Sequence, residues 1–230
     1  MVAAASARIP TARTLHWTAA TVTSPAGEPP AWLGELRALR AEVLYENGRR
    51  PEFGKGGARD GDADPLDLHS HHVLARDQSA VVGCVRITPL SAPLPSVTEQ
   101  TIGQQRLSEV LNHVGASADR VVEHGRWIVA ASHQSLGTGI YLMAASFALA
   151  FKLGYPFSVA TVSEEVVPIL VRAGARRVPG LATIPSRKYN DRLIVLYGRQ
   201  REFAPAALTQ FQQMADLLGL GPVYRRAPRR

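Results

Sequence analysis

The chain has 230 residues and a mass of 24.8 kDa, which is enough for one sizeable hydrophobic core and short for two. Hydrophobic residues make up 46% and charged residues 20%, an ordinary balance that argues against disorder beyond the ends. The net charge is +7 and the pI about 10.1, so acidic partners are plausible. Nucleic acid is not expected as a partner, because no helix-turn-helix, zinc-finger or aromatic-basic RNA motif is present.

Cysteine content and hydropathy indicate a cytoplasmic protein. The single cysteine, Cys84, rules out a disulfide within the chain and fits a reducing compartment. Arg8 and Arg13 interrupt the N-terminal segment before any apolar signal develops. The longest apolar stretch, 140–151, is too short to cross a bilayer, so we expect no integral membrane segment.

Periodicity predicts one α/β (α+β) domain, over residues 14–220. Apolar spacing and Gly/Pro breakers predict the following order: strand 14–22, helix 31–47, strands 71–76 and 80–90, helix 101–114, strand 121–131, helix 137–153, strand 157–162, a helix ending at 174, strands 175–184 and 192–197, and helix 205–218. This mixture implies a mixed, mostly antiparallel sheet with parallel neighbours at its centre.

Three segments outside these elements need a separate interpretation. The segment 49–64 is rich in glycine and charge, and is expected to be a mobile loop that is either an active-site lid or disordered. Residues 1–13 are expected to form a flexible N-terminal segment. The basic tail 221–230 is either a solvated charge run or a docking element for an acidic acyl carrier protein.

The most informative stretch is the strand, glycine-rich loop and helix over 121–155. The loop 134–139 reads QSLGTG, a Q-x-x-G-x-G pattern at the expected start of a helix. Glycines there let the backbone approach an anion closely, and free N–H groups with the helix dipole attract negative charge. This geometry suits the phosphates of coenzyme A or of a phosphopantetheine arm, which indicates a protein that handles acyl thioesters.

This unit, in its place in the element order, resembles the GNAT acyltransferase superfamily. The resemblance implies a GNAT fold with a splayed parallel strand pair and helices on both faces of the sheet. It also implies acyl-CoA or acyl-phosphopantetheine as a co-substrate and no permanently bound cofactor. The implied donor-binding residues are Ile128, Val129, Ala130, Gln134, Leu136, Gly137, Thr138 and Gly139.

A narrower resemblance is to acyl-homoserine-lactone synthases and long-chain N-acyl amino acid synthases. It rests on LR at 39–40, the acidic loop with Asp64 before a His-rich strand, GCVR at 83–86 and EHGR at 123–126. The matching positions are Arg40, Asp67, Arg86, Glu123 and Arg126. The resemblance implies acyl transfer from acyl carrier protein to a small-molecule amine, with Arg40, Asp67 and Arg86 binding substrate and Glu123 and Arg126 in catalysis.

Departures from the lactone-synthase pattern favour an amino acid, rather than S-adenosylmethionine, as the acceptor. Phe53 is the only aromatic residue in GRRPEFG, where the lactone synthases carry a tryptophan soon after the first helix. Gly125 replaces the serine of their E-x-S-R strand, and the acidic loop continues into LHSHH. A lactone synthase, a non-catalytic acyl-binding domain and an acetyl-CoA-dependent acetyltransferase remain alternatives.

Amide formation from a thioester needs a deprotonated amine and a polarised carbonyl, and no covalent enzyme intermediate. Backbone N–H groups over 128–130 are candidate oxyanion donors. Glu123 is either a general base, directly or through water, or the salt-bridge partner of an arginine such as Arg86. On a regular strand, Glu123 and Arg126 would point to opposite faces.

The remaining polar residues have plainer interpretations. Buried arginines at 40, 86 and 126 need carboxylate partners, either internal or on a substrate. Cys84, inside a strand with no base beside it, is expected to be a core residue rather than a nucleophile. The HSHH run at 69–72 with its neighbouring aspartates fits no zinc or EF-hand spacing, so no metal is expected.

Overall fold

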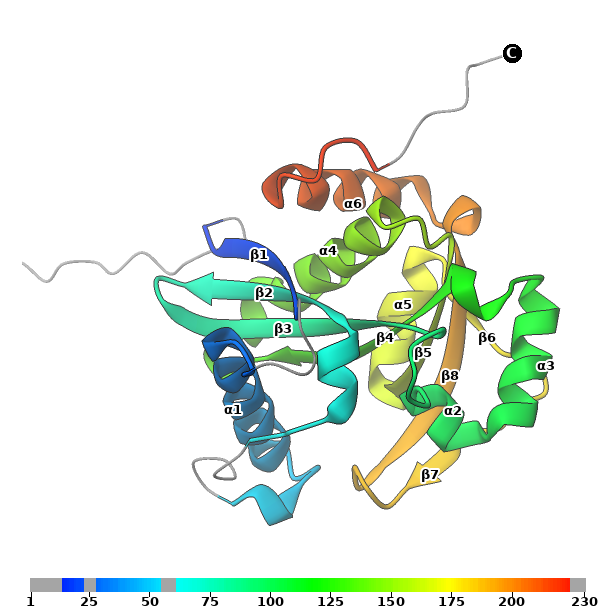
Figure 1. Cartoon of the computed structure of the whole chain (residues 1–230), viewed down its shortest axis with the longest axis horizontal. Helices are drawn as coiled ribbons and strands as arrows, with labels where there is room; N and C mark the ends of the chain where they lie inside the picture. The colour runs from blue at the N-terminus through cyan, green and yellow to red at the C-terminus, as the bar shows by residue number, and fades with distance from the viewer. Residues whose placement is uncertain (1–13, 23–27, 55–60, 224–230) are drawn as a thin grey trace, which may run out of the picture.

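The computed structural model describes residues 14–22, 28–54 and 61–223, whose helices and strands Figure 1 shows. The strands are β1 (His16–Thr21), β2 (His71–Asp77), β3 (Ala80–Pro89), β4 (Val121–Val129), β5 (Phe157–Ser163), β6 (Arg176–Arg177), β7 (Ile184–Ser186) and β8 (Asp191–Arg199). The α-helices are α1 (Ala31–Glu46), α2 (Val97–Ile102), α3 (Gln104–Val114), α4 (Thr138–Lys152), α5 (Val167–Ala173) and α6 (Pro205–Leu217).

The strands form one sheet in the order β1-β2-β3-β4-β5-β8-β6, with β7 also paired to β8. Every pairing is antiparallel except β4 with β5, the two central strands, which run parallel. Their register covers only Val121–Glu123 opposite Phe157–Val159, after which the two strands separate. The predicted mostly antiparallel sheet with a parallel, splayed central pair is therefore confirmed.

Helices cover both faces of the sheet, because strand side chains alternate between them. Leu74 and Cys84 pack in the cluster that α1 closes, whereas their neighbours Val73 and Val85 belong to the larger core around α4, α5 and α6. Helix α3 packs against β4, β5 and β8 on the same face as α1. We call the two sides the α1 face and the α4 face.

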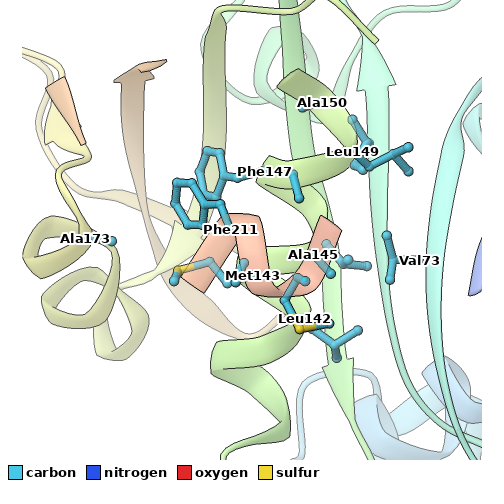
Figure 2. Close-up of a cluster of buried hydrophobic side chains, with 14 of the residues drawn as sticks. Val73, Leu142, Met143, Ala145, Phe147, Leu149, Ala150, Ala173 and Phe211 are labelled. Carbon is cyan, nitrogen blue, oxygen red and sulfur yellow. The ribbon is translucent and has the colours of Figure 1, made fainter. Parts of the chain in front are cut away.

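The α4 face holds the largest apolar cluster, much of which Figure 2 shows. Alanines along α4, including Ala145 and Ala148, are fully buried and let this helix lie close to the sheet. Phe147 of α4 stacks on Phe211 of α6 with ring centroids 5.2 Å apart, so α6 covers α4 from outside. No helix in the described part of the chain is long and apolar enough to cross a membrane.

Two predicted elements differ from the structure. The helix expected over 101–114 is present as α3 over 104–114, but its first residues belong to a separate helix, α2, because the intervening Gly103 has φ +82° and breaks the helical path. The strand expected over 175–184 is two short strands, β6 and β7, separated by a turn in which Gly180 has φ +71°. Both breaks are at glycines with left-handed backbone.

The predicted termini and part of the predicted loop fall outside the described residues. This holds for the N-terminal segment 1–13, for 224–230 of the basic tail and for 55–60 of the loop. On either side of 55–60 the loop has defined contacts. Arg49 forms an ion pair with Asp191, and the N–H of Asp62 donates to the carbonyl of Arg37 at 3.0 Å.

Candidate functional site

The divergence of β4 and β5 opens a cleft through the centre of the sheet. Its empty volume is about 1180 Å³, part of which is open to solvent. Its lining comes mainly from β4, β5, β8 and α4, including every residue from Glu123 to Ile128. The cleft therefore meets both faces of the sheet, and the two faces give it different chemistry.

The part of the cleft on the α4 face is apolar. Met143 and Phe147 of α4, Leu170 of α5 and Leu196 of β8 line it, and all four belong to the large core cluster. Figure 2 shows Met143 and Phe147 on the side of α4 that faces Phe211. A space bounded by such side chains favours an apolar ligand group, because binding removes apolar surface from water.

On the α1 face, Arg86 and Arg126 line the cleft, and behind them lies a buried ionic cluster with Asp67 at its centre. Arg40 of α1 binds this carboxylate with both terminal nitrogens, at 2.9 Å (Nη1–Oδ1) and 2.7 Å (Nη2–Oδ2), and Arg86 Nη1 of β3 lies 3.0 Å from Oδ1. All three side chains are at most 1% exposed. Burial alone would raise the pKa of Asp67, but hydrogen bonds and charge from Arg40 and Arg86 outweigh it and hold the pKa far below its usual range.

Arg126 joins this cluster because β4 is bulged. Gly125 pairs with Arg86 and Ile128 with Cys84, so Arg126 and Trp127 together oppose a single residue of β3. Arg126 has φ +54°, and its side chain lies on the α1 face with Glu123. The expectation that Glu123 and Arg126 point to opposite faces is therefore wrong, since it holds only for a regular strand.

The contacts of Arg126 are with the acidic loop and with Tyr189. Its Nη2 lies 2.8 Å from Asp64 Oδ2 and its Nε 3.1 Å from Asp62 Oδ2, while Nη1 donates to the Tyr189 hydroxyl. Burial alone would lower the pKa of Arg126, but Asp62, Tyr189 and Asp64 outweigh it, so the pKa is raised. Arg126 thus holds the loop at 62–67 against the sheet.

The cluster carries excess positive charge and unused donors. Its members are Arg37, Arg40, Arg86, Arg126, Asp62, Asp64 and Asp67. Four guanidinium groups thus face three carboxylates. Nε and Nη2 of Arg86, which lines the cleft, are buried with no hydrogen-bond partner among the described residues. An anionic group entering from the cleft would find the unused N–H donors of Arg86.

Glu123 is held by the start of α2. It is 1% exposed, and its oxygens accept hydrogen bonds from the backbone N–H groups of Val97, at 3.1 Å, and Thr98. The alternative in which Glu123 pairs with Arg86 is wrong, because Arg86 pairs with Asp64 and Asp67. Glu123 nevertheless lines the cleft, where one carboxylate can reach a ligand on the α1 face.

The loop before α4 is a 3₁₀ turn over Ala131–Leu136, followed by Gly137 with φ +76°. Gln134 Nε2 donates to the carbonyl of Val129 at 3.1 Å. A Cβ added at Gly137 would meet no atom within 4 Å, so open space surrounds this residue at the first turn of α4. Of the predicted donor-binding residues, the side chain of Leu136 lies outside the described set.

The candidate oxyanion donors over 128–130 are not equivalent. The N–H of Ala130 donates to the carbonyl of Val82 in β3 at 2.9 Å, which removes it as a donor to a ligand. Backbone groups alternate along a strand, so the N–H and carbonyl of Val129 face the cleft edge, where Gln134 already meets the carbonyl. Ile128 contributes its side chain to the α1-face core.

Thr138 and Gly139, at the start of α4, bring this helix close to the sheet. Thr138 is fully buried, and its hydroxyl has no partner among the described residues. A Cβ at Gly139 would lie 3.5 Å from the Trp127 ring, so the helix start lies close to this side chain of β4. Both residues support the position of the loop.

Cys84 and the histidine run have structural environments. Cys84 is fully buried beneath α1, and burial raises the pKa of its thiol to about 12, so it is a core residue. His72 is also buried, and its Nε2 contacts the backbone carbonyl of Asp67 at 2.9 Å. Within the described ranges, no group of three His, Cys, Asp or Glu residues is arranged to hold a metal ion.

Comparison with known proteins finds a family model that matches part of the chain. Residues 39–144 match the family described as acetyltransferase (GNAT) domain. The matched stretch begins within α1 and ends within α4. No curated protein sequence gives a significant match.

Solved structures share the fold over nearly the whole chain. BjaI, a CoA-dependent acyl-homoserine lactone synthase solved with MTA, has a TM-score of 0.64 at 17% identity, covering 94% of this chain and 95% of that one. The AHL synthase LasI has a TM-score of 0.56 at 20% identity, covering 92% and 100%. An acyl-CoA N-acyltransferase from Pseudomonas aeruginosa has a TM-score of 0.54 at 18% identity, and the match covers 80% of this chain and 99% of that one.

These findings confirm the predicted GNAT fold and the resemblance to lactone synthases, and they support an acyltransferase. Sequence reasoning missed several residues of the site. Tyr189 carries no local signal, since its partner Arg126 is 63 residues away. Asp62 stands in the same acidic run as Asp64 and could have been included on composition alone.

Proposed function

We propose that this GNAT domain transfers a medium or long acyl group from a coenzyme A or acyl carrier protein thioester to the amine of an amino acid or a related small molecule. The observation that supports it is the two-sided cleft between β4 and β5. Its α4 face is apolar and suits an acyl chain, while on its α1 face the unused N–H donors of Arg86 suit the carboxylate of an amino acid.

The donor thioester would enter beside the loop before α4. Open space at Gly137 and the first N–H groups of α4 would receive a phosphate, and the cleft edge of β4 at Val129 would meet the pantetheine arm. Gln134, Thr138 and Gly139 shape this entrance. The thioester carbon would then lie near the β4 bulge, between the two faces of the sheet.

The reaction is a direct aminolysis. The amine nitrogen attacks the thioester carbon, the carbon–sulfur bond breaks, and the amide and a free thiol form. Glu123, directly or through water, would take the proton that the amine loses, and the departing thiolate would take up a proton. Arg86 would bind the acceptor carboxylate through its unused donors, while Arg40, Asp67 and Arg126 hold Arg86 and the acidic loop in place.

Acyl transfer from acyl-CoA and acyl carrier protein to a panel of amino acids tests this directly, with thiol release and product mass as readouts. Glu123→Gln, which keeps the shape of the side chain, is expected to lower kcat, and Arg86→Gln to raise KM for the amine more than for the thioester. Absence of an amide product with any amine would refute the proposal.

Gly137→Asp tests the phosphate site, with Gly137→Asn as the matched control. Both side chains must adopt the same left-handed backbone, which asparagine and aspartate tolerate, but only aspartate adds negative charge. We expect Gly137→Asp to raise KM for the thioester well above the value for Gly137→Asn. Equal values would place the phosphates elsewhere.

A lactone synthase is the second candidate, favoured by the fold shared with BjaI over 94% of this chain. It would use S-adenosylmethionine as acceptor and release methylthioadenosine with the lactone, so detecting that nucleoside separates the two candidates. The choice between acyl carrier protein and coenzyme A, and a cytoplasmic location, stay predictions.

A further inference from the structure

His124 is a buried polar side chain that the proposed transfer leaves unused. It follows Glu123 on β4 and points to the opposite face, where its ring lies 4.3 Å from that of Phe147 between centroids. The side chain lines the cleft and is 9% exposed. A polar group thus stands in the apolar part of the cleft.

We assign the tautomer of His124 from its contacts. Its Nδ1 lies 3.0 Å from the hydroxyl oxygen of Ser146, and that hydroxyl donates its single proton to the backbone carbonyl of Met143 at 2.8 Å. The Ser146 oxygen can therefore only accept from the ring, so the proton of the neutral imidazole is on Nδ1. The other nitrogen, Nε2, carries a lone pair and is a hydrogen-bond acceptor.

That acceptor has no hydrogen-bond partner in the described part of the chain. Nε2 is buried and makes no hydrogen bond to any described residue. Burial lowers the pKa of His124 to about 3, so the ring stays neutral near pH 7 and keeps its lone pair. An unpaired acceptor beside the apolar side chains of the cleft is costly, and a ligand hydroxyl would remove that cost.

We propose that the apolar part of the cleft takes an acyl chain with a hydroxyl near its thioester, as in a 3-hydroxyacyl group, and that this hydroxyl donates to Nε2 of His124. The inference rests on the proposed function for the direction of the acyl chain. The thioester lies near the bulge at Arg126, and His124 is two residues deeper along β4, roughly 7 Å at strand spacing. The first few carbons of the chain lie within that reach.

The position of the proton decides between related substrates. A 3-hydroxyl group can donate to a lone pair, whereas a 3-oxo group offers only acceptors and an unsubstituted chain offers neither. His124 therefore selects hydroxylated chains over both. Ser146 acts through His124, as the residue that fixes its tautomer.

Binding without an amine tests this independently of turnover. Calorimetric titration with 3-hydroxydecanoyl-CoA, decanoyl-CoA and 3-oxodecanoyl-CoA is expected to give a preference of about tenfold or more for the hydroxylated thioester, the equivalent of one good hydrogen bond. His124→Phe, which keeps an aromatic ring against Phe147, is expected to reduce that preference to about twofold or less.

Ser146→Ala supplies a second readout that simple loss of packing would not produce. Without the serine oxygen to accept from Nδ1, the imidazole can carry its proton on Nε2 and donate instead. The preference is then expected to move from the 3-hydroxyacyl toward the 3-oxoacyl thioester. Ser146→Ala also tests the role of His124 if the His124→Phe variant does not fold.

Equal affinities of the wild type for the three thioesters would overturn the inference, as would failure to bind any of them, or a preference unchanged in both variants. A preference that depends on His124, found together with no transfer to any amine, would refute only the proposed function.

Discussion

Replacing Asp67 by asparagine should cost more stability than almost any other single polar change in this chain. Asparagine keeps the shape of the side chain but removes the charge that Arg40 and Arg86 share in a site where all three are at most 1% exposed. The cluster would then hold four guanidinium groups against two carboxylates. Removing one partner of a buried ion pair typically costs about 3–5 kcal/mol, because the other charge stays buried without compensation.

Urea denaturation followed by circular dichroism at pH 7 measures this loss. At typical urea slopes of about 1–3 kcal/mol per molar, the midpoint should fall by roughly 1 M or more. Glu109→Gln is the matched control, since Glu109 pairs with Arg106 at the surface, where the two side chains are 48% and 65% exposed. Glu109→Gln should change the free energy of unfolding by no more than about 1 kcal/mol. If Asp67→Asn cost no more than this control, the cluster would not be the rigid support that we infer.

Three further predictions concern other parts of the molecule. Burial lowers the pKa of His72 to about 4 and that of His124 to about 3, while both side chains ionise near pH 6.5 in the unfolded chain. The free energy of unfolding should therefore be highest above about pH 7 and fall by roughly 2 kcal/mol per histidine at pH 5, because the unfolded chain takes up protons that the folded one does not. Denaturant titrations between pH 7 and 5, above the range where carboxylates protonate, should show this loss, and a flat profile would contradict neutral burial. Gly61→Ala should cost about 1–3 kcal/mol in a thermal melt, because its φ is +64° and a Cβ would lie 2.6 Å from the backbone carbon of Arg37; an unchanged melting temperature would contradict this close approach. Cys84 should resist alkylation by iodoacetamide in the folded protein and react in urea, because it is fully buried and its pKa is raised to about 12; rapid native labelling would exclude the core assignment.

Most elements could be predicted from the sequence because the buried side of a helix or strand requires apolar residues at a regular spacing. Helix α4 and strands β3 and β4 carry apolar patterns, with Gly137 before α4 and Pro89 at the end of β3, and the structure places all three within a few residues of the expected bounds. The errors fell where glycines interrupt an apolar pattern, as at Gly103 and Gly180. Apolar spacing reports which residues are buried, but it does not report a local change of backbone direction.

The candidate site was predictable in its parts but not in its pairings. Buried arginines require carboxylates, and that requirement alone anticipated the internal network around Asp67. Which carboxylate meets which arginine depends on contacts 19 to 62 residues apart along the chain. The bulge was also hidden, because an arginine at φ +54° has no sequence signature, and it reversed the inferred direction of one side chain.

The bulge links the two halves of the proposed chemistry. Glu123 and His124 are neighbours on β4, so regular alternation sends one to the charged side of the cleft and the other to the apolar side. The extra residue at the bulge shifts the alternation, so Arg126 lies on the charged side and Ile128, two residues later, packs in the α1-face core. Side chains on one face of β4 can thereby contact the acceptor, while those on the other face contact the acyl chain. Substitutions at Arg86 should therefore alter the selectivity for the amine and leave that for the acyl chain nearly unchanged. Substitutions at His124 should do the reverse.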